Sequence, residues 1–195
     1  MMKKLFAMSL ALVFAGALLP GTVSAQPVKP AKDPVAQRAV LHKDVLEAIE
    51  NFKKADPSMD RFFKQSAGYA VFARVGKAGL ILGTGAGDGE VFEKGKVVGM
   101  ASTGYATIGL QAGIQEFSEV LFFKDAAALE RFKQSNWEFA GGASIVIVKA
   151  GAAGSTDYSN GVAVFARPSG GAMAEASLGT QKFTYKADPA PATKK

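Results

Sequence analysis

The chain has 195 residues, no cysteine and one histidine, and its 23 Lys and Arg against 17 Asp and Glu give a net charge of +6. The lack of cysteine excludes disulfides and thiolate chemistry, and a single histidine excludes a metal site built on two histidines. A charge of this size permits attraction to anionic surfaces, whereas nucleic acid is a poor fit because no recognised nucleic-acid-binding motif accompanies it.

The first 25 residues are typical of an export signal. Lys3 and Lys4 precede an uncharged apolar run over residues 5–19, and Val23-Ser24-Ala25 supplies small residues before a cut at Gln26. The run is shorter than the ~20 residues that a membrane-spanning helix needs. We therefore expect a cleaved signal and a mature periplasmic or secreted protein, either free or peripheral on a membrane. Loss of residues 1–25 leaves 170 of the 195, with 21 Lys and Arg against 17 Asp and Glu, a net charge of +4.

Proline, alanine and lysine dominate residues 26–33 and 188–195, which we expect to be a disordered linker and a disordered tail. Between them, residues 34–187 are long enough to form one domain with a core that needs no covalent staples.

This domain begins with a predicted amphipathic helix. Asp33 can cap it, and Pro34 suits the first helical position. One apolar stripe follows, consisting of Leu41, Val45, Ala48, Ile49 and Phe52. Asp56-Pro57 ends the helix, and Ser58 is a candidate cap for a shorter helix that reaches Gln65. The stripe is compatible with docking on the domain's own sheet or with insertion into a membrane, although the acidic residues on the opposite face favour docking.

Beyond residue 68 the apolar period changes to two, which predicts strands. We expect strands at 69–73 and 77–82 separated by a Val75-Gly76 turn, a short strand at 90–92 between Asp88-Gly89 and Lys94-Gly95 turns, and further strands at 106–115 and 119–123.

A second amphipathic segment, residues 126–134, is predicted to be a helix capped by Asp125. Strands are predicted at 144–148, 162–166, 172–176 and 182–185, with a hairpin turn at Asn160-Gly161. The order of elements predicts an α+β fold, with a curled, mostly antiparallel, barrel-like sheet, an N-terminal amphipathic helix and one or two further helices. Ala-Val-Phe-Ala-Arg occurs at both 70–74 and 163–167, which is compatible with a duplicated unit or with coincidence among strand-forming residues.

Catalytic and cofactor motifs are missing from the sequence. The glycines of residues 83–89 lack the spacing of a dinucleotide fingerprint, and a glycine-rich strand or hairpin accounts for them better. Asp88 and Glu90 provide too few oxygens for Ca²⁺ and are interpreted as a solvated hairpin tip. Glu116 and Glu119 would face opposite sides of a strand, and His42 is interpreted as a helix-surface residue. We expect no enzymatic activity and no cofactor.

Four segments carry a resemblance to a known family. GYAVFARVGKAGLILGTGAGDGEVF, GKVVGMASTGYATIGLQAGIQEFSEVLFF, WEF at 137–139 and NGVAVFARPSGGAMAEASLGTQKFTY are similar in order and spacing to bacterial SYLF (DUF500-type) proteins. The resemblance covers residues 35–185, nearly the whole mature chain. It implies a phospholipid-binding module and, for an exported protein, an anionic envelope lipid as ligand.

The sequence also suggests where such a lipid would bind. Basic and aromatic residues cluster around the end of the first helix and could engage anionic headgroups while an aromatic ring enters the interface. The candidate residues are Lys53, Lys54, Arg61, Lys64, Lys77, Phe52, Phe62 and Phe63. The alternatives are that the phenylalanines are core residues with a solvated basic rim, and that the protein is a structural envelope component that contacts other proteins without lipid specificity.

Overall fold

The computed structural model describes residues 33–78, 82–108, 114–134, 137–140, 145–169 and 179–189, all within one compact unit, Lys32–Lys195. The other unit, Met1–Ala31, contains none of the described residues. The predicted signal peptide, most of the linker and tail, and the predicted strand at 172–176 therefore lie outside the described residues.

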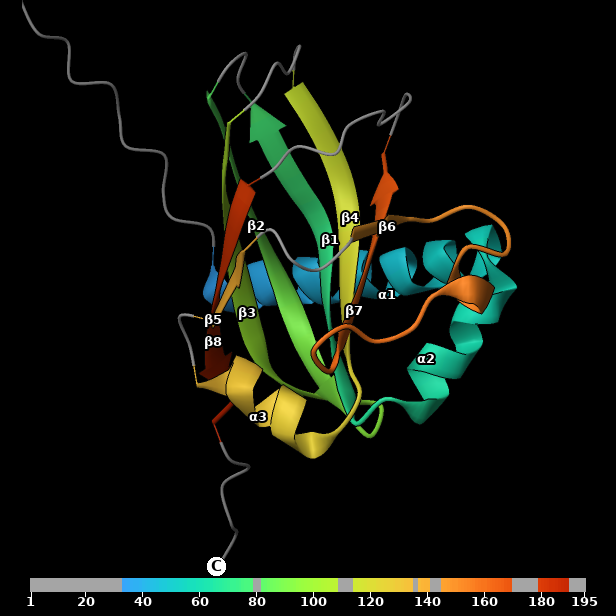
Figure 1. The fold of residues 1–195 in the computed structure, drawn as a ribbon. Helices are drawn as coiled ribbons and strands as arrows, with labels where there is room; N and C mark the ends of the chain where they lie inside the picture. Colours follow the sequence, from blue (N-terminus) through green and yellow to red (C-terminus); the bar gives the residue numbers. More distant parts are fainter. Residues whose placement is uncertain are drawn as a thin grey trace, which may run out of the picture. The chain divides into compact units, whose positions relative to one another are not determined.

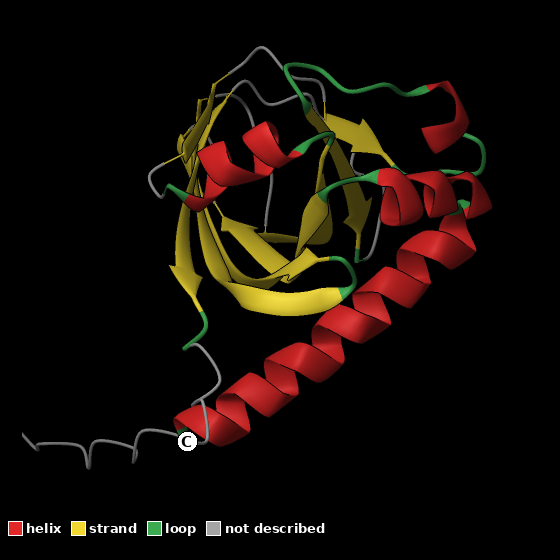
Figure 2. Cartoon of the chain, turned by 90° about the horizontal axis from the view of Figure 1, so that it is seen from below, coloured by secondary structure: helices red, strands yellow, loops and turns green. Residues whose placement is uncertain are grey.

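Eight described strands form one curled sheet, a half-barrel seen most clearly in Figure 2. The strands are β1 (Gly68–Ala78), β2 (Leu82–Glu93), β3 (Lys96–Ile108), β4 (Ile114–Phe123), β5 (Trp137–Ala140), β6 (Ile145–Ile147), β7 (Val162–Pro168) and β8 (Gly179–Ala187). Their order across the sheet is β5-β8-β3-β2-β1-β4-β7-β6, and every neighbouring pair is antiparallel except β6 and β7. The predicted α+β class with a curled, mostly antiparallel sheet is confirmed.

Two apolar cores lie on the two faces of this sheet. Inside the curl, Phe72, Leu121 and Phe183 pack with Leu129 and Phe132 of α3 (Ala126–Lys133). Outside it, helix α1 (Pro34–Ala55) crosses the sheet, followed by the 3₁₀ turn η1 (Pro57–Met59), α2 (Asp60–Gln65) and, later in the chain, η2 (Ala153–Ser155) (Figures 1 and 2). Alternation of side chains along β1, β2, β4 and β7 supplies both cores, so these four strands are apolar on both faces.

The predicted helix starts agree with the structure at two of three positions. Asp33 accepts a hydrogen bond from the backbone N–H of Val35, and Asp125 accepts one from Ala128. The cap of the second helical segment is Asp56, which accepts from the N–H and the hydroxyl of Ser58, so the prediction that Ser58 is the cap is wrong. Asp56 can do this because it sits one residue before Pro57, in extended conformation.

Glycine-containing dipeptides gave both correct and incorrect turn predictions. Lys94-Gly95 and Asn160-Gly161 are turns, with φ of 51° and 75° in the first and 51° and 83° in the second. Asp88-Gly89 lies inside β2, so the predicted turn is wrong. A Cβ at Gly89 would lie 2.3 Å from the Val71 carbonyl oxygen and 2.7 Å from the Phe72 ring, so this glycine permits close packing of neighbouring strands.

The predicted turn at Val75-Gly76 is also wrong, because both residues lie within β1. Residues 69–73 and the start of 77–82 belong to one strand, and Val75-Gly76 follows a bulge where the register shifts against both β2 and β4. Because of the bulge, Val75 returns to the inner core while Arg74 contacts Asp44 of α1 on the outer face.

The single strand predicted at 106–115 is also wrong. Residues 106–108 end β3, which pairs with β2 and β8, whereas residues 114–115 begin β4, which pairs with β1 and β7. The alternating pattern did not reveal the break because both strands obey the same period.

Candidate functional site

Four of the predicted cations lie on the last turn of α1 and on α2, two helices that follow each other in the chain (Figure 1). Lys53 and Lys54 occupy the last turn of α1, where the helix dipole favours positive charge, and Arg61 and Lys64 lie on α2. We call these four residues the basic corner. Lys64 Nζ lies 2.9 Å from Asp60 Oδ2, and this contact, together with the charge of Lys53, lowers the pKa of Asp60.

The aromatic part of the prediction needs correction. Phe52 is 0% exposed and Phe62 is 2% exposed, and both belong to the core between the helices and the sheet. They occupy the buried faces of α1 and α2, so neither can enter a membrane in the folded protein. Phe63 is half-buried, packs edge-on against Tyr69 and Phe122, and has Lys53 Nζ 5.1 Å from its ring centroid.

Arg61 has a structural role in addition to its charge. It donates hydrogen bonds to the carbonyl oxygens of Ala153, at 2.7 Å, and of Thr156, and its guanidinium lies 4.6 Å from the Phe62 ring centroid. These contacts tie α2 to η2, which comes from a segment about ninety residues later in the chain. A substitution at Arg61 would therefore change the fold locally as well as the surface charge.

Lys77 lies apart from the basic corner. It occupies β1 nine residues beyond Gly68, about 30 Å along an extended strand. Its backbone pairs with Gly85 and Gln115, and its side chain is outside the described part of the structure.

Asp56 joins the basic corner to the rest of the fold. Its carboxylate is 1% exposed and accepts hydrogen bonds from Ser58 and, at 2.7 Å, from the N–H of Ala153. Burial by itself raises the pKa of Asp56, but the hydrogen bonds from Ser58 and from the backbone outweigh it and lower the pKa below its ordinary value. The contact with Ala153 could not be predicted from the sequence, because the partner lies 97 residues away in the chain and no local pattern indicates it.

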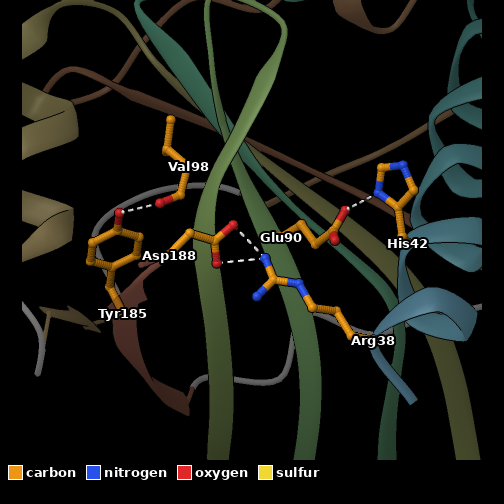
Figure 3. A network of polar contacts seen from close by, with 6 residues as sticks. All are labelled: Arg38, His42, Glu90, Val98, Tyr185 and Asp188. Atoms are coloured by element: carbon orange, nitrogen blue, oxygen red, sulfur yellow. Dashed lines mark hydrogen bonds and ion pairs between the residues drawn. The ribbon is translucent and has the colours of Figure 1, made fainter. Parts of the chain in front are cut away.

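A separate set of polar contacts holds the first half of α1 (Figure 3). The Arg38 guanidinium binds both carboxylate oxygens of Asp188, which raises the pKa of Arg38. His42 Nδ1 lies 2.8 Å from Glu90 Oε2, and Asp44 pairs with Arg74. The His42 side chain is 46% exposed, so the interpretation of a surface histidine is correct, with a specific partner that the sequence did not reveal.

The prediction that Asp88 and Glu90 form a solvated hairpin tip is wrong, because both residues lie inside β2. Glu90 is 1% exposed in the middle of β2, whereas Asp88 is exposed and accepts a hydrogen bond from Ser102 Oγ at 2.7 Å. The described residues contain no group of three or more His, Asp or Glu side chains arranged to hold a metal ion.

A buried polar cluster lies inside the curl. Gln181 Nε2 donates to Thr103 Oγ1 at 2.9 Å and to Glu119 Oε2 at 2.6 Å, linking β8, β3 and β4. Glu119 is fully buried while Glu116 is exposed, so the two do face opposite sides of β4 as predicted. The sequence did not indicate that Glu119 would lie in the core.

Helix α1 is the longest described helix, and none of the described helices has the length and apolar character needed to cross a membrane. Helix α1 docks on the domain's own sheet through Val45, Ala48, Ile49 and Phe52. This confirms the docking that the acidic residues on its opposite face predicted.

No family model matches the chain. The chain is similar to Beta cell expansion factor A of Aeromonas veronii, with 29% identity over 136 residues. The alignment covers 68% of this chain and 51% of that protein, so the chain spans about half the length of this curated relative.

Proposed function

We propose that the chain is a non-catalytic protein of the cell envelope that binds anionic phospholipid at a membrane surface through the basic corner. The observation that carries the proposal is the placement of four cations on the last turn of α1 and on α2, with one of them, Lys53, 5.1 Å from the ring centroid of the half-buried Phe63. The resemblance of the sequence to SYLF proteins supports the same function.

The energetics suit reversible, salt-sensitive attachment. Each Lys or Arg near an anionic bilayer contributes about 1 kcal/mol, and this attraction falls off within a Debye length. Lys54 is exposed and has no ion pair within the described residues, while Lys64 shares its charge with Asp60. Phe63 supplies a ring at the rim, so that electrostatic attraction and limited apolar contact act together.

Co-sedimentation with vesicles tests the proposal. Phosphatidylcholine vesicles with and without phosphatidylglycerol would be compared at low and at physiological salt. We expect binding only to the anionic vesicles, weakened by salt.

A triple variant locates the binding surface. Lys53→Glu, Lys54→Glu and Lys64→Glu together leave Arg61 and its contacts in place, and we expect them to abolish binding. The matched control is Lys96→Glu, Lys182→Glu and Lys186→Glu, which makes the same change in charge at exposed positions on β3 and β8. No binding by the unmodified chain, or equal loss of binding in both triple variants, would contradict the proposal.

One observation favours the second candidate, a protein that contacts other envelope proteins. Ile145 and Ile147 are each 37% exposed on β6, a strand at the end of the sheet order. Ile145→Thr with Ile147→Thr should abolish self-association or cross-linking if these residues form a protein contact. Vesicle binding that survives this change would leave the lipid proposal as the better explanation.

A further inference from the structure

A small polar cavity lies between α1 and the outer face of the sheet, and none of the four residues of the basic corner lines it. Its volume is about 200 Å³, roughly the volume of seven water molecules in the liquid. The polar residues that line it include Asp44, Glu47 and Asn51 from α1, Arg74 from β1, Ser118 from β4 and Arg167 from β7. The cavity thus brings two guanidinium groups and two carboxylates around a space large enough for a small molecule.

The two arginines occupy the last position of the repeated pentapeptide, Arg74 in the first copy and Arg167 in the second. Strands β1 and β7 flank β4, and Arg167 pairs directly with Ser118, while Arg74 lies in the bulge on the other side of β4. The two copies of the sequence have opposite side-chain alternation, since Phe72 belongs to the inner core and Phe165 to the outer one. The bulge reverses the alternation at Arg74, and both arginines consequently reach the outer face, with backbones about 10 Å apart, two strand spacings.

The charges in the cavity are only partly paired. Arg74 binds Asp44, but within the described part of the chain Arg167 has no ion pair or hydrogen bond to its side chain, and neither does Glu47. One guanidinium and one carboxylate therefore line the same space without a partner among the described residues. A simple anion would be attracted by Arg167 but repelled by Glu47. A simple cation would be attracted by Glu47 but repelled by Arg167.

We propose that this cavity binds a zwitterion with a phosphate and a primary ammonium group, of which phosphoethanolamine is the simplest example. Arg167, assisted by Arg74, donates two parallel hydrogen bonds to phosphate oxygens, a geometry for which the guanidinium is suited. The ammonium group donates to Glu47, with Asp44 close by. A trimethylated ammonium has no N–H to donate, so the cavity favours phosphoethanolamine over phosphocholine.

This site goes beyond the proposed function, because it requires neither an anionic membrane nor the basic corner. The ligand can come from free phosphoethanolamine or from the headgroup of phosphatidylethanolamine. Titration of the purified chain with soluble phosphoethanolamine tests the chemistry, and co-sedimentation with phosphatidylcholine vesicles with and without phosphatidylethanolamine, which carry no net charge, tests the lipid source.

Calorimetric titration should show binding of phosphoethanolamine at least tenfold tighter than that of phosphocholine or inorganic phosphate. Arg167→Gln and Glu47→Gln should each weaken it at least tenfold, because each removes a charge-assisted hydrogen bond. Glu50→Gln on the same helix and Lys149→Gln, both exposed and outside the cavity, are the matched controls and should bind as the unmodified chain does. All four variants should unfold at the same temperature, since none of the replaced side chains has a described polar partner.

Three results would overturn the proposal: no binding of phosphoethanolamine at millimolar concentration, equal affinity for phosphate, or unchanged affinity in Glu47→Gln. Binding of the soluble molecule without recruitment to phosphatidylethanolamine vesicles would assign the site to a free metabolite. The triple variant of the basic corner should retain this binding, so failure of one proposal is distinguishable from failure of the other.

Discussion

The two halves of α1 lie on the same sheet but are held there by different forces. Residues 45–55 bury Val45, Ala48, Ile49 and Phe52 against strands β1, β2, β4 and β7. In residues 34–44 none of the side chains is fully buried. Leu41 is partly buried against the outer core, and the other contacts named above are polar: Arg38 with Asp188, His42 with Glu90, and Asp44 with Arg74.

This difference shows that one helix can be anchored by one half and positioned by the other. Apolar burial is nearly independent of pH and salt, whereas partly exposed ion pairs are weakened by salt. Burial of the second half therefore stabilises the docking of α1 on the sheet. The contacts of the first half can be weakened without disrupting the buried core.

The largest effect should come from the apolar half. Phe52→Ala removes a ring that is 0% exposed and leaves a cavity between α1 and the sheet, so we expect the free energy of unfolding to fall by about 3–5 kcal/mol. Leu46→Ala, on the same helix but at a 46% exposed position, should change it by less than about 0.5 kcal/mol. Urea unfolding of both variants measures the difference, and similar losses at the two positions would contradict the assignment of the buried face.

An intermediate effect is expected at the end of the apolar half. Asp56→Asn should destabilise the fold by about 1–3 kcal/mol at neutral pH, because a buried charged acceptor of several hydrogen bonds is lost.

The pH dependence gives a second readout of the same variant. Because folding lowers the pKa of Asp56 from its ordinary value of 3.8, its stabilising contribution is present above that pH and is lost as the pH falls through the lower folded-state pKa. Stability measured between neutral pH and pH 3 should therefore fall less in Asp56→Asn than in the unmodified chain. Parallel curves for the two proteins would show that Asp56 is not the group responsible.

The smallest effect should be confined to the polar half. His42→Ala leaves the carboxylate of Glu90 buried without its histidine partner, which should cost about 1–2 kcal/mol. Hydrogen exchange should accelerate at the amides of residues 38–44 and remain unchanged at residues 48–52. Equal acceleration along the whole helix would mean that the two halves are not separable.

Features encoded within a few residues could be predicted from the sequence. Asp33-Pro34, Asp125 and the turns at Lys94-Gly95 and Asn160-Gly161 depend on capping and on backbone conformations with positive φ, and the structure confirms them. The docked stripe of α1 follows from helical periodicity in the same way.

Features that depend on partners distant in the chain could not be predicted. The role of Gly89 is set by Phe72 on the neighbouring strand, so the local dipeptide was mistaken for a turn. Phe62 was a candidate for membrane contact because its burial depends on Phe122 and Phe165, far along the chain. The convergence of Arg74 and Arg167 was visible only as a repeated pentapeptide, and the bulge that completes it has no sequence signature of its own.

The contact between Arg38 and Asp188 spans 150 residues and has a consequence for the order of assembly. A chain synthesised from its N-terminus has all of α1 early, but its outermost ionic contact requires the last residues of the domain. The apolar half of α1 has β1 as a partner soon after it emerges, whereas the first turns wait until β8 has joined the sheet beside β3. The first turns of α1 are therefore fixed in place only when the last strand has formed. A chain that ends before residue 188 would keep its cores but would lack the contact between Arg38 and Asp188.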